Sequence, residues 1–120
     1  MELPLTGTFR KSERLCGKSS IAALLGKGRW IAGTHIKCCY RALPPESECS
    51  RIAVSVPKRN FKRAVKRNLL KRRMRESYRT QKSILDAGRY DIMFVWTSRE
   101  LADSNVIREE TAQLLKRISK

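Results

Sequence analysis

Residues 58–79 read KRNFKRAVKRNLLKRRMRESYR, and eleven of these 22 residues are Lys or Arg. On a helix that turns by about 100° per residue, the side chains of this region separate into two stripes. The stripe suited to a core consists of Leu70, Met74, Ser77, Tyr78, Gln81 and Leu85. The outward stripe is almost wholly cationic and consists of Ala64, Asn68, Lys71, Arg72, Arg75 and Arg79. The pattern predicts an amphipathic helix that follows Pro57, has an Asn60 cap and ends near Lys82.

This predicted helix carries more positive charge than a solvated surface needs. Like charges recur four residues apart in the pairs Lys62/Lys66, Arg63/Arg67, Arg67/Lys71, Lys71/Arg75 and Arg75/Arg79. Each such pair costs roughly 0.2–0.5 kcal/mol, and only Arg72/Glu76 opposes them at the same spacing. Basic residues in the first turn also oppose the helix dipole. Because nothing within the helix offsets this repulsion, the pattern favours a nucleic-acid partner over a merely solvated face.

The composition of the whole chain supports the same interpretation. Its 120 residues include 27 Lys plus Arg and 11 Asp plus Glu, which gives a formal net charge of +16 and a pI near 10.5. We expect one RNA-binding domain over residues 1–120, with residues 1–17 as an extended basic segment. Self-repulsion favours a monomer when RNA is absent. No stretch resembles a signal peptide or a membrane span, so we expect a cytoplasmic protein without a membrane partner.

The cysteines and acidic residues point to neither a metal site nor a nuclease. Cys16, Cys38, Cys39 and Cys49 contain no CxxC pair, and reduced thiols are expected. A zinc site would have only His35 as a further ligand. Glu76, Asp86 and Asp91 show no paired arrangement that would hold catalytic metals. The residues therefore predict no catalytic group, metal site or cofactor within the protein.

The remaining elements follow from hydrophobic periodicity. Residues 18–25 fit a short helix that ends at the glycines of residues 26–28, and residues 34–43 alternate as a half-buried strand. Residues 51–56 form a second strand, most simply joined to the first as a hairpin, and residues 91–96 suit a central strand buried on both faces. Asp103 or Ser104 opens a last helix with Ile107, Thr111, Leu114, Leu115 and Ile118 inward. These elements predict an α/β fold, specifically an α+β two-layer sandwich.

The run of residues 64–76, AVKRNLLKRRMRE, resembles the Arg-Asn-Arg signature of the bacterial ribonuclease P protein component. In that family the signature follows a strand ending in Ser-Val-x-Lys, which corresponds here to the SVPK of residues 55–58. The similarity extends to Arg14-Leu15, the Gly-Lys-Gly of residues 26–28, the strand pair and the C-terminal LLKR of residues 114–117. The resemblance implies the order helix, strand, strand, a further strand, helix, strand, helix. It also implies a left-handed β-α-β crossover, whereas the general rule gives a right-handed one.

The resemblance also implies a function. The protein would be the non-catalytic subunit of a ribonucleoprotein endoribonuclease, whose RNA subunit, with bound magnesium, removes the 5′ leader from precursor tRNA. The expected contacts to the catalytic RNA are the signature residues Arg67, Asn68, Lys71, Arg72 and Arg75, with Arg79, Lys62 and Arg63 beside them. Leu69 replaces the usual third signature Arg, and we expect charge at Lys62, Arg63 and Arg73 to offset it. The alternative class is a ribosomal or nucleoid-type basic RNA-binding protein.

The 5′ leader is expected to lie in a cleft beside this helix. The residues assigned to the cleft are Ile21, Leu25, His35, Lys37, Cys39, Arg41 and Lys58. Four of them, His35, Lys37, Cys39 and Arg41, alternate along one strand face, which either faces water or forms a groove floor with Ala53 and Ser55. Ile21 and Leu25 stand where the family usually has aromatic residues. Trp96 is expected to be structural, and Trp30 is either structural or beside the cleft.

Overall fold

The computed structural model describes residues 15, 18–44, 46–47, 50–85 and 88–119. Most of the predicted N-terminal segment 1–17, together with Cys16, Cys49 and Asp86, lies outside this part of the chain. The elements in order are α1 (Lys18–Lys27), β1 (Arg29–Ala32), β2 (Ile36–Ala42), β3 (Arg51–Ser55), α2 (Ala64–Arg79), the 3-10 helix η2 (Lys82–Leu85), β4 (Tyr90–Trp96) and α3 (Ser104–Ile118).

The four strands form one sheet in the order β1-β2-β4-β3. β2 is antiparallel to both β1 and β4, whereas β3 runs parallel to β4. The predicted hairpin between residues 34–43 and 51–56 is therefore wrong, because β4 lies between these two strands. The apolar run of β4 suits a central strand, and β4 has a hydrogen-bonded neighbour on each side. Its face toward α2 and α3 is buried, whereas Met93 and Val95 on the other face are half-buried. The predicted β-α-β unit consists of β3, α2 and β4.

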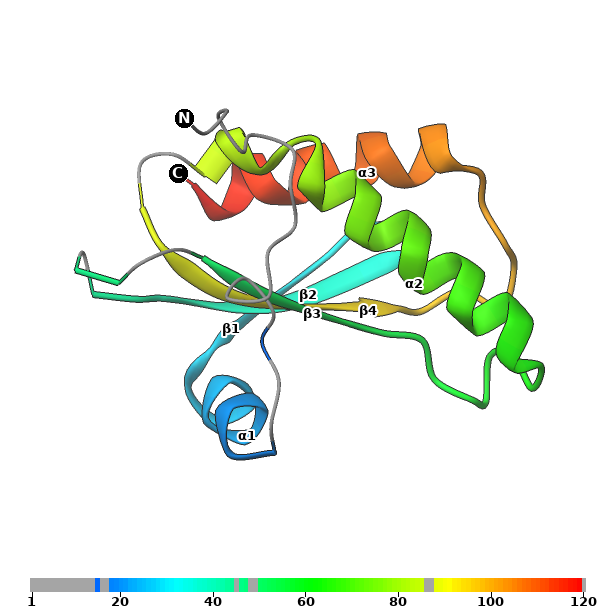
Figure 1. Cartoon of the computed structure of the whole chain (residues 1–120), viewed down its shortest axis with the longest axis horizontal. Helices are drawn as coiled ribbons and strands as arrows, with labels where there is room; N and C mark the ends of the chain where they lie inside the picture. Colours follow the sequence, from blue (N-terminus) through cyan, green and yellow to red (C-terminus); the bar gives the residue numbers. More distant parts are fainter. Residues whose placement is uncertain (1–14, 16–17, 45, 48–49, 86–87, 120) are drawn as a thin grey trace, which may run out of the picture.

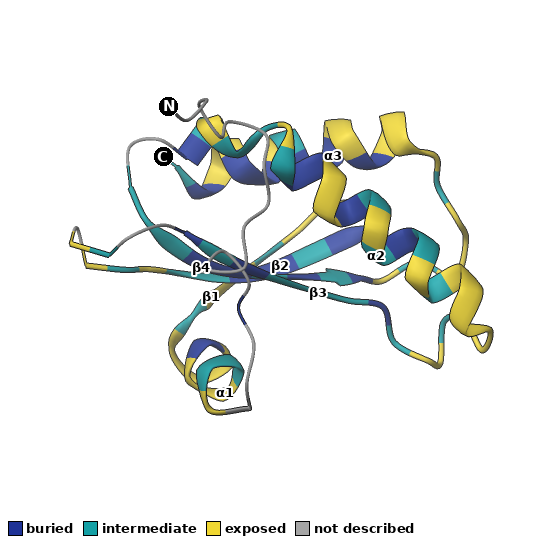
Figure 2. Ribbon diagram, in the orientation of Figure 1, coloured by how far each residue is buried: buried dark blue, intermediate teal, exposed yellow. Residues whose placement is uncertain are grey.

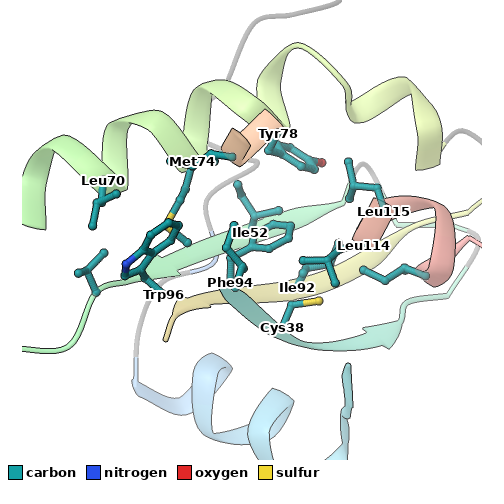
Figure 3. Packing of buried hydrophobic residues seen from close by; sticks show 14 of the residues in the cluster. Cys38, Ile52, Leu70, Met74, Tyr78, Ile92, Phe94, Trp96, Leu114 and Leu115 are labelled. Atoms are coloured by element: carbon teal, nitrogen blue, oxygen red, sulfur yellow. The ribbon is translucent and has the colours of Figure 1, made fainter. Parts of the chain in front are cut away.

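The two faces of the sheet are covered unequally, as Figure 1 shows. Helices α2 and α3 lie together on one face, and α1 lies alone on the other. The large core lies under α2 and α3 and includes Leu70, Met74, Tyr78, Phe94, Trp96 and Leu114 (Figure 3). Among the described residues, the cluster under α1 contains Leu15, Leu24 and Cys39, with Ile21, Ala53 and Met93 packed against it. The described helices therefore leave part of the sheet surface on the α1 side uncovered.

The apolar stripe predicted for α2 is buried as expected at Leu70, Met74, Ser77 and Tyr78. The helix itself begins at Ala64 and ends at Arg79, so the predicted continuation to Lys82 is wrong. Leu85 is buried, but it belongs to η2. The predicted Asn60 cap is also wrong, because the Asn60 side chain donates a hydrogen bond to the Trp96 carbonyl, 3.1 Å away.

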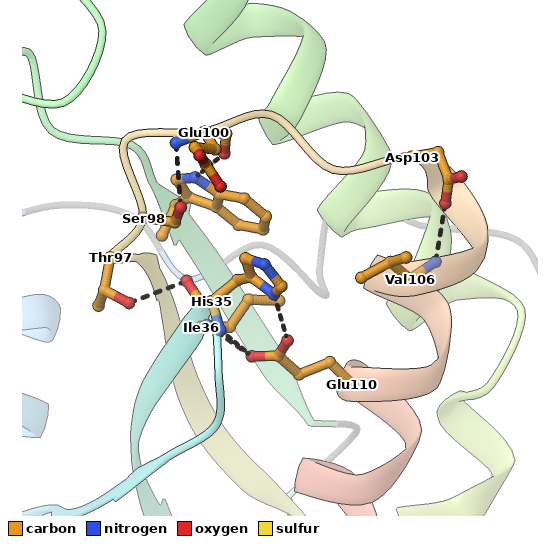
Figure 4. A network of polar contacts seen from close by, with 9 residues as sticks. His35, Ile36, Thr97, Ser98, Glu100, Asp103, Val106 and Glu110 are labelled. Atoms are coloured by element: carbon orange, nitrogen blue, oxygen red, sulfur yellow. Dashed lines mark hydrogen bonds and ion pairs between the residues drawn. The ribbon is translucent and has the colours of Figure 1, made fainter.

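Helix α3 begins as predicted. The side chain of Asp103 caps it by accepting a hydrogen bond from the backbone N–H of Val106 at 3.0 Å (Figure 4). All five residues predicted to face inward are buried. Its Glu110 carboxylate accepts hydrogen bonds from the backbone N–H groups of His35 and Ile36 at 2.7 and 2.6 Å, and Arg117 donates to the Ala32 carbonyl at 2.9 Å. Helix α3 therefore holds the turn between β1 and β2 in place.

Close packing explains two of the glycines. A Cβ at Gly28 would lie 2.5 Å from the Cys39 sulfur and 2.7 Å from the Leu24 carbonyl, so the end of α1 can approach β2 only without a side chain there. A Cβ at Gly33 would meet the Glu110 carboxylate at 2.6 Å. Both glycines allow helices to sit directly against the β1–β2 hairpin.

Candidate nucleic-acid interface

The outward face of α2 presents a row of cations, which we call the basic face and define as Asn68, Lys71, Arg72 and Arg75. Asn68, Arg72 and Arg75 are exposed, and Lys71 is half-buried. Figure 2 shows stretches of exposed residues along α2. Arg72 and Arg75 form no ion pair with any residue that the structure describes. Lys62 and Arg63 are exposed immediately before the helix, in line with its N-terminus. The basic face thus carries positive charge that its surroundings do not neutralise.

Helix α2 also lacks the usual local stabilisers. Its N-cap residue, Arg63, makes no side-chain cap hydrogen bond, and the first turn contains no acidic residue. The positive charge at that end opposes the helix dipole. Packing of the buried stripe against the sheet must therefore hold the helix in place, which leaves the sequence of its outer face free to serve a partner.

Two arginines of this region have structural contacts that the sequence did not reveal. The Arg67 guanidinium donates through Nη1 to the carbonyl oxygens of Phe61 and Lys62 at 2.7 and 2.8 Å, which closes the loop before α2. Arg73 donates through Nη1 to the Ala102 carbonyl at 2.6 Å and joins α2 to the segment before α3. The expected use of Arg73 to offset Leu69 is therefore wrong, because its guanidinium points toward α3.

The predicted pairing of Glu76 is wrong as well. Glu76 binds Arg79, with Oε1 2.7 Å from Nη2 and Oε2 3.0 Å from Nε, and not Arg72. The hydrogen bond from Arg79 lowers the pKa of Glu76 below its usual value. Arg79, assigned to the RNA contact, thus shares its charge with a neighbour, and Arg72 keeps its charge exposed.

Apolar groups flank the basic face on its N-terminal side. Val65 is 77% exposed, which is unusual for a valine on a helix that packs against a sheet. Leu69, one turn further along, is half-buried. Leu69 therefore lies at the margin between the two stripes, where it can make apolar contacts but no charged one.

A second surface lies on the α1 side of the sheet. The strand register aligns Ala32, Lys37, Val95 and Ser55 in one row across all four strands, which we call the open row. Ala32 is exposed, and the other three side chains are half-buried. Helix α1 covers the neighbouring row, which contains Cys39 and Met93. Ile21 of α1 is half-buried and Leu25 is 42% exposed, so apolar surface borders the open row.

Three of the predicted cleft residues are engaged by other groups of the fold. His35 precedes β2, and its Nδ1 lies 3.0 Å from Oε1 of Glu110 on α3 (Figure 4). Its ring stacks on Trp96, with the ring centroids 5.3 Å apart. Cys39 is fully buried beneath Leu24, so it supports the surface without being accessible from it. Burial raises the pKa of its thiol, and raises that of Cys38 to about 12.

Arg41 is the third of these residues, and its guanidinium forms an ion pair with the buried Asp91. The fully buried Asp91 carboxylate accepts two hydrogen bonds from Arg51 at 2.8 Å each, and a longer one from Arg41 Nη2 at 3.4 Å. A guanidinium bound to a buried carboxylate has less charge available for RNA. Lys58 is exposed in the turn after β3, between the open row and the start of α2.

The sequence left Trp30 as either structural or beside the cleft, and among the described residues it is a large exposed side chain near the open row. It is 47% exposed, and the Lys37 ammonium nitrogen lies 4.9 Å from the centroid of its ring. β1 has four residues, three of them exposed, so it lacks the alternation that would have located Trp30 on a strand face. The exposure of this edge strand is visible only in the structure, so the sequence could not decide between the two alternatives for Trp30.

The described residues form neither a metal site nor a membrane span. They contain no group of three or more His, Cys, Asp or Glu side chains that could hold a metal ion. Every helix in this part of the chain is too short or too polar to cross a bilayer. The two surfaces present exposed cations beside apolar groups, which is the chemistry that binds a polyanion.

Comparison with known proteins identifies that polyanion's class. The model of the family described as Ribonuclease P matches residues 9–119. A ribonuclease P protein component from Porphyromonas gingivalis is 33% identical over 99% of this chain and 92% of the relative. The ribonuclease P protein of Thermotoga maritima superposes with a TM-score of 0.75 and 25% identity over 88% of this chain and 96% of that one. The protein from Staphylococcus aureus superposes with a TM-score of 0.76 and 23% identity, covering 90% and 96% of the two chains.

These matches confirm the resemblance found in the signature helix and leave no support for the alternative of a ribosomal or nucleoid protein. They also account for the four-stranded sheet, of which the residues alone predicted three strands. The chain therefore belongs to the ribonuclease P protein family, as a component of a ribonucleoprotein endoribonuclease whose partner is the ribonuclease P RNA.

Proposed function

We propose that this chain binds the ribonuclease P RNA through the basic face of α2 and the 5′ leader of precursor tRNA through the open row beside α1. In this role the protein helps the RNA subunit to remove the leader. Cleavage itself is assigned to the RNA subunit and its magnesium ions, because the two protein surfaces offer cations and apolar groups rather than a placed acid and base. No residue of the protein is proposed to be catalytic.

One observation carries the assignment of the basic face: Arg72 and Arg75 are exposed on a helix and unpaired among the described residues. A guanidinium binds a phosphate through two parallel hydrogen bonds, and a helix holds successive guanidinium groups at fixed spacing. Asn68 on the same face can donate and accept hydrogen bonds to a base edge or a sugar. Lys62 and Arg63 extend the positive field before the N-terminus of the helix, and Lys71 adds to it between Asn68 and Arg72.

Arg67 and Arg79 have a different role in this proposal. Arg67 fixes the loop that presents Lys62 and Arg63, since it holds the Phe61 and Lys62 carbonyls. Arg79 is partly neutralised by Glu76. We expect both to influence RNA affinity less directly than Arg72 and Arg75 do.

The proposal for the leader follows from the open row. Single-stranded RNA is bound where cations meet the backbone and flat or apolar groups meet the bases. Lys37 and Lys58 supply the cations, and Val95, Ile21 and Leu25 supply apolar surface around them. Ser55 adds a hydroxyl that can donate to a phosphate or a base. His35 and Arg41 are withdrawn as direct contacts because they bind Glu110 and Asp91, and Cys39 is withdrawn because it is buried.

Charge neutralisation links the two surfaces to the reaction. Precursor tRNA and the RNA subunit are both polyanions, so they repel each other as they approach. A chain with a formal net charge of +16 lowers this repulsion and releases condensed counterions when it binds. The same charge keeps free copies of the chain apart, and we propose a monomer before assembly. We place the protein in the bacterial cytoplasm, where precursor tRNA is made.

The test is reconstitution with catalytic RNA from the same source and precursor tRNA at near-physiological magnesium. We expect the protein to increase turnover, and to increase the affinity for precursor tRNA more than for mature tRNA. Lys37→Gln should reduce this preference for precursor. Turnover that is the same with and without protein would overturn the proposed function, and equal gains for precursor and mature tRNA would remove the leader contact from it.

A further inference from the structure

Packing within the protein does not explain the position of Trp30. It belongs to neither of the two apolar clusters, although Trp96 is fully buried in the larger one. It pairs with Cys39 across the β1–β2 ladder, so its side chain lies on the α1 side of the sheet. An indole that is 47% exposed at a sheet edge contributes little to folding and leaves apolar surface in water.

The neighbour of Trp30 is a cation. Lys37 lies two residues before Cys39 on the same strand face, and its ammonium nitrogen is 4.9 Å from the indole centroid. This is a cation–π contact, which places positive charge against one face of the ring. The contact leaves the rest of the exposed indole accessible, at the end of the open row where Ala32 is also exposed.

The backbone that carries both residues is held firmly. Glu110 accepts hydrogen bonds from the N–H groups of His35 and Ile36 at the turn between β1 and β2. Arg117 holds the Ala32 carbonyl, two residues after Trp30. A rigid aromatic beside a cation is the arrangement that binds a single-stranded base with its adjacent phosphate, since little conformational freedom is lost on binding.

We propose that Trp30 is a base-stacking residue of the leader-binding surface, with Lys37 neutralising the phosphate next to the stacked base. This inference rests on the proposed function and names the contact through which it acts. The aromatic group absent from α1, where Ile21 and Leu25 stand, is supplied instead by β1. A stacked indole tolerates every base but favours the larger ring system of a purine.

Intrinsic fluorescence tests the contact directly, because the chain contains two tryptophans. Trp96 is fully buried and donates its Nε1–H to the Glu100 carbonyl at 3.2 Å, so single-stranded RNA should not reach it. Titration of the full chain with a leader oligonucleotide should therefore quench the emission of Trp30. The response should disappear in Trp30→Phe. Quenching that persists in Trp30→Phe would overturn the inference.

Binding to the assembled holoenzyme tests the contribution to affinity. Trp30→Ala should weaken precursor tRNA binding by about 5- to 100-fold and leave mature tRNA binding unchanged, whereas Trp30→Tyr should retain most of the affinity. Val106→Ala, which removes another exposed apolar side chain from α3, is the matched control and should bind as the wild type does. An unchanged thermal midpoint in Trp30→Ala excludes loss of folding as the cause.

The position of the stacked base can be found with precursors that carry one abasic nucleotide at each leader position in turn. At the stacked position, wild type and Trp30→Ala should bind the abasic precursor equally, while they differ at the other positions. A wild-type holoenzyme that fails to prefer precursor over mature tRNA would refute the proposed leader binding. If that preference is present and Trp30→Ala keeps it in full, the leader contact stands and the role of Trp30 is refuted.

Discussion

Helices α2 and α3 lie on the same face of the sheet and have 16 and 15 residues, yet they are built by different rules. Helix α3 has an Asp103 side-chain cap, basic residues in its last turn and a Glu110 that binds the sheet edge. Helix α2 begins at an uncapped arginine and contains Glu76 as its one acid. The local sequence of α3 stabilises the folded chain. The outer face of α2 lowers the stability of its own helix and presents cations that can bind RNA.

The difference between them is possible because both helices bury an apolar stripe. Leu70, Met74 and Tyr78 fix α2 on the core without help from its termini, as Leu114 and Leu115 fix α3 (Figure 3). Tertiary packing, rather than helix propensity, usually decides whether a helix of this length is stable. Substitutions on the outer surface of α2 should therefore lower RNA affinity without lowering the free energy of unfolding. We expect no such loss of RNA affinity from substitutions on α3.

The largest effect is expected from Arg72→Ala with Arg75→Ala. Each lost charge-assisted contact should weaken binding to the catalytic RNA by about tenfold or more, with the unfolding free energy unchanged or slightly raised. Arg108→Ala with Lys116→Ala removes the same charge from exposed positions of α3 and serves as the matched control. Direct binding at fixed salt compares the two. Equal losses in both double variants would mean that net charge, and not the basic face, determines affinity.

The second largest effect is expected on folding, where loss of Glu110 from α3 should be far more costly than loss of Glu76 from α2. Glu110→Ala removes the acceptor of the buried Ile36 N–H and of the part-buried His35 N–H, and should lower the unfolding free energy by about 2 kcal/mol. Glu76→Ala removes an exposed pair with Arg79 and should have little effect. Urea denaturation measures both. A stable Glu110→Ala variant would show that the turn does not depend on α3.

Removing the N-cap of α3 should have a smaller effect on stability than removing Glu110. Asp103→Ala removes the acceptor for the Val106 N–H and should destabilise the protein by about 1 kcal/mol. The loss should leave the affinity for catalytic RNA unchanged, because the cap lies on the helix that is not assigned to RNA. A shift in RNA affinity after correction for the unfolded fraction would place α3 in the interface.

The smallest change should have opposite effects on folding and binding. Arg63→Asn gives α2 a side-chain cap at a residue whose backbone is already extended, with φ −80° and ψ 126°. The free protein should become more stable by about 0.5–1 kcal/mol, while RNA affinity falls by a few-fold through the loss of one cation. Thermal unfolding and RNA binding of the same preparation check the two parts. A variant that gains both stability and affinity would contradict the functional explanation for the missing cap.

Hydrophobic periodicity predicted those elements that pack one face against the core and leave the other face exposed, and it predicted the buried central strand. It located the buried stripe of α2, the cap and inward face of α3, and the central β4. It could not give the strand order, because sequence spacing does not show that β4 enters between β2 and β3. It missed β1 as a strand, since a four-residue edge strand with three exposed residues has no alternation to detect.

The candidate interface was predictable to the extent that it depends on helix geometry. Exposure of Asn68, Arg72 and Arg75 followed from their spacing alone. The errors came from long-range partners: Ala102 binds Arg73, Asp91 binds Arg41, and Glu110 binds His35 from 75 residues away. Cys39 lies on the predicted strand face, but α1 covers it. Such contacts join residues that are far apart in the sequence, so the spacing of residues within one helix or strand cannot predict them.

The central claim is that the exposed guanidinium groups of α2 contact phosphates of the catalytic RNA. The direct test is the dependence of binding on salt concentration for the wild type and for Arg72→Ala with Arg75→Ala. The log-log slope should become shallower by roughly 0.7–0.9 per lost contact, and the α3 double variant should keep the wild-type slope. An α2 double variant with the wild-type slope would contradict the account.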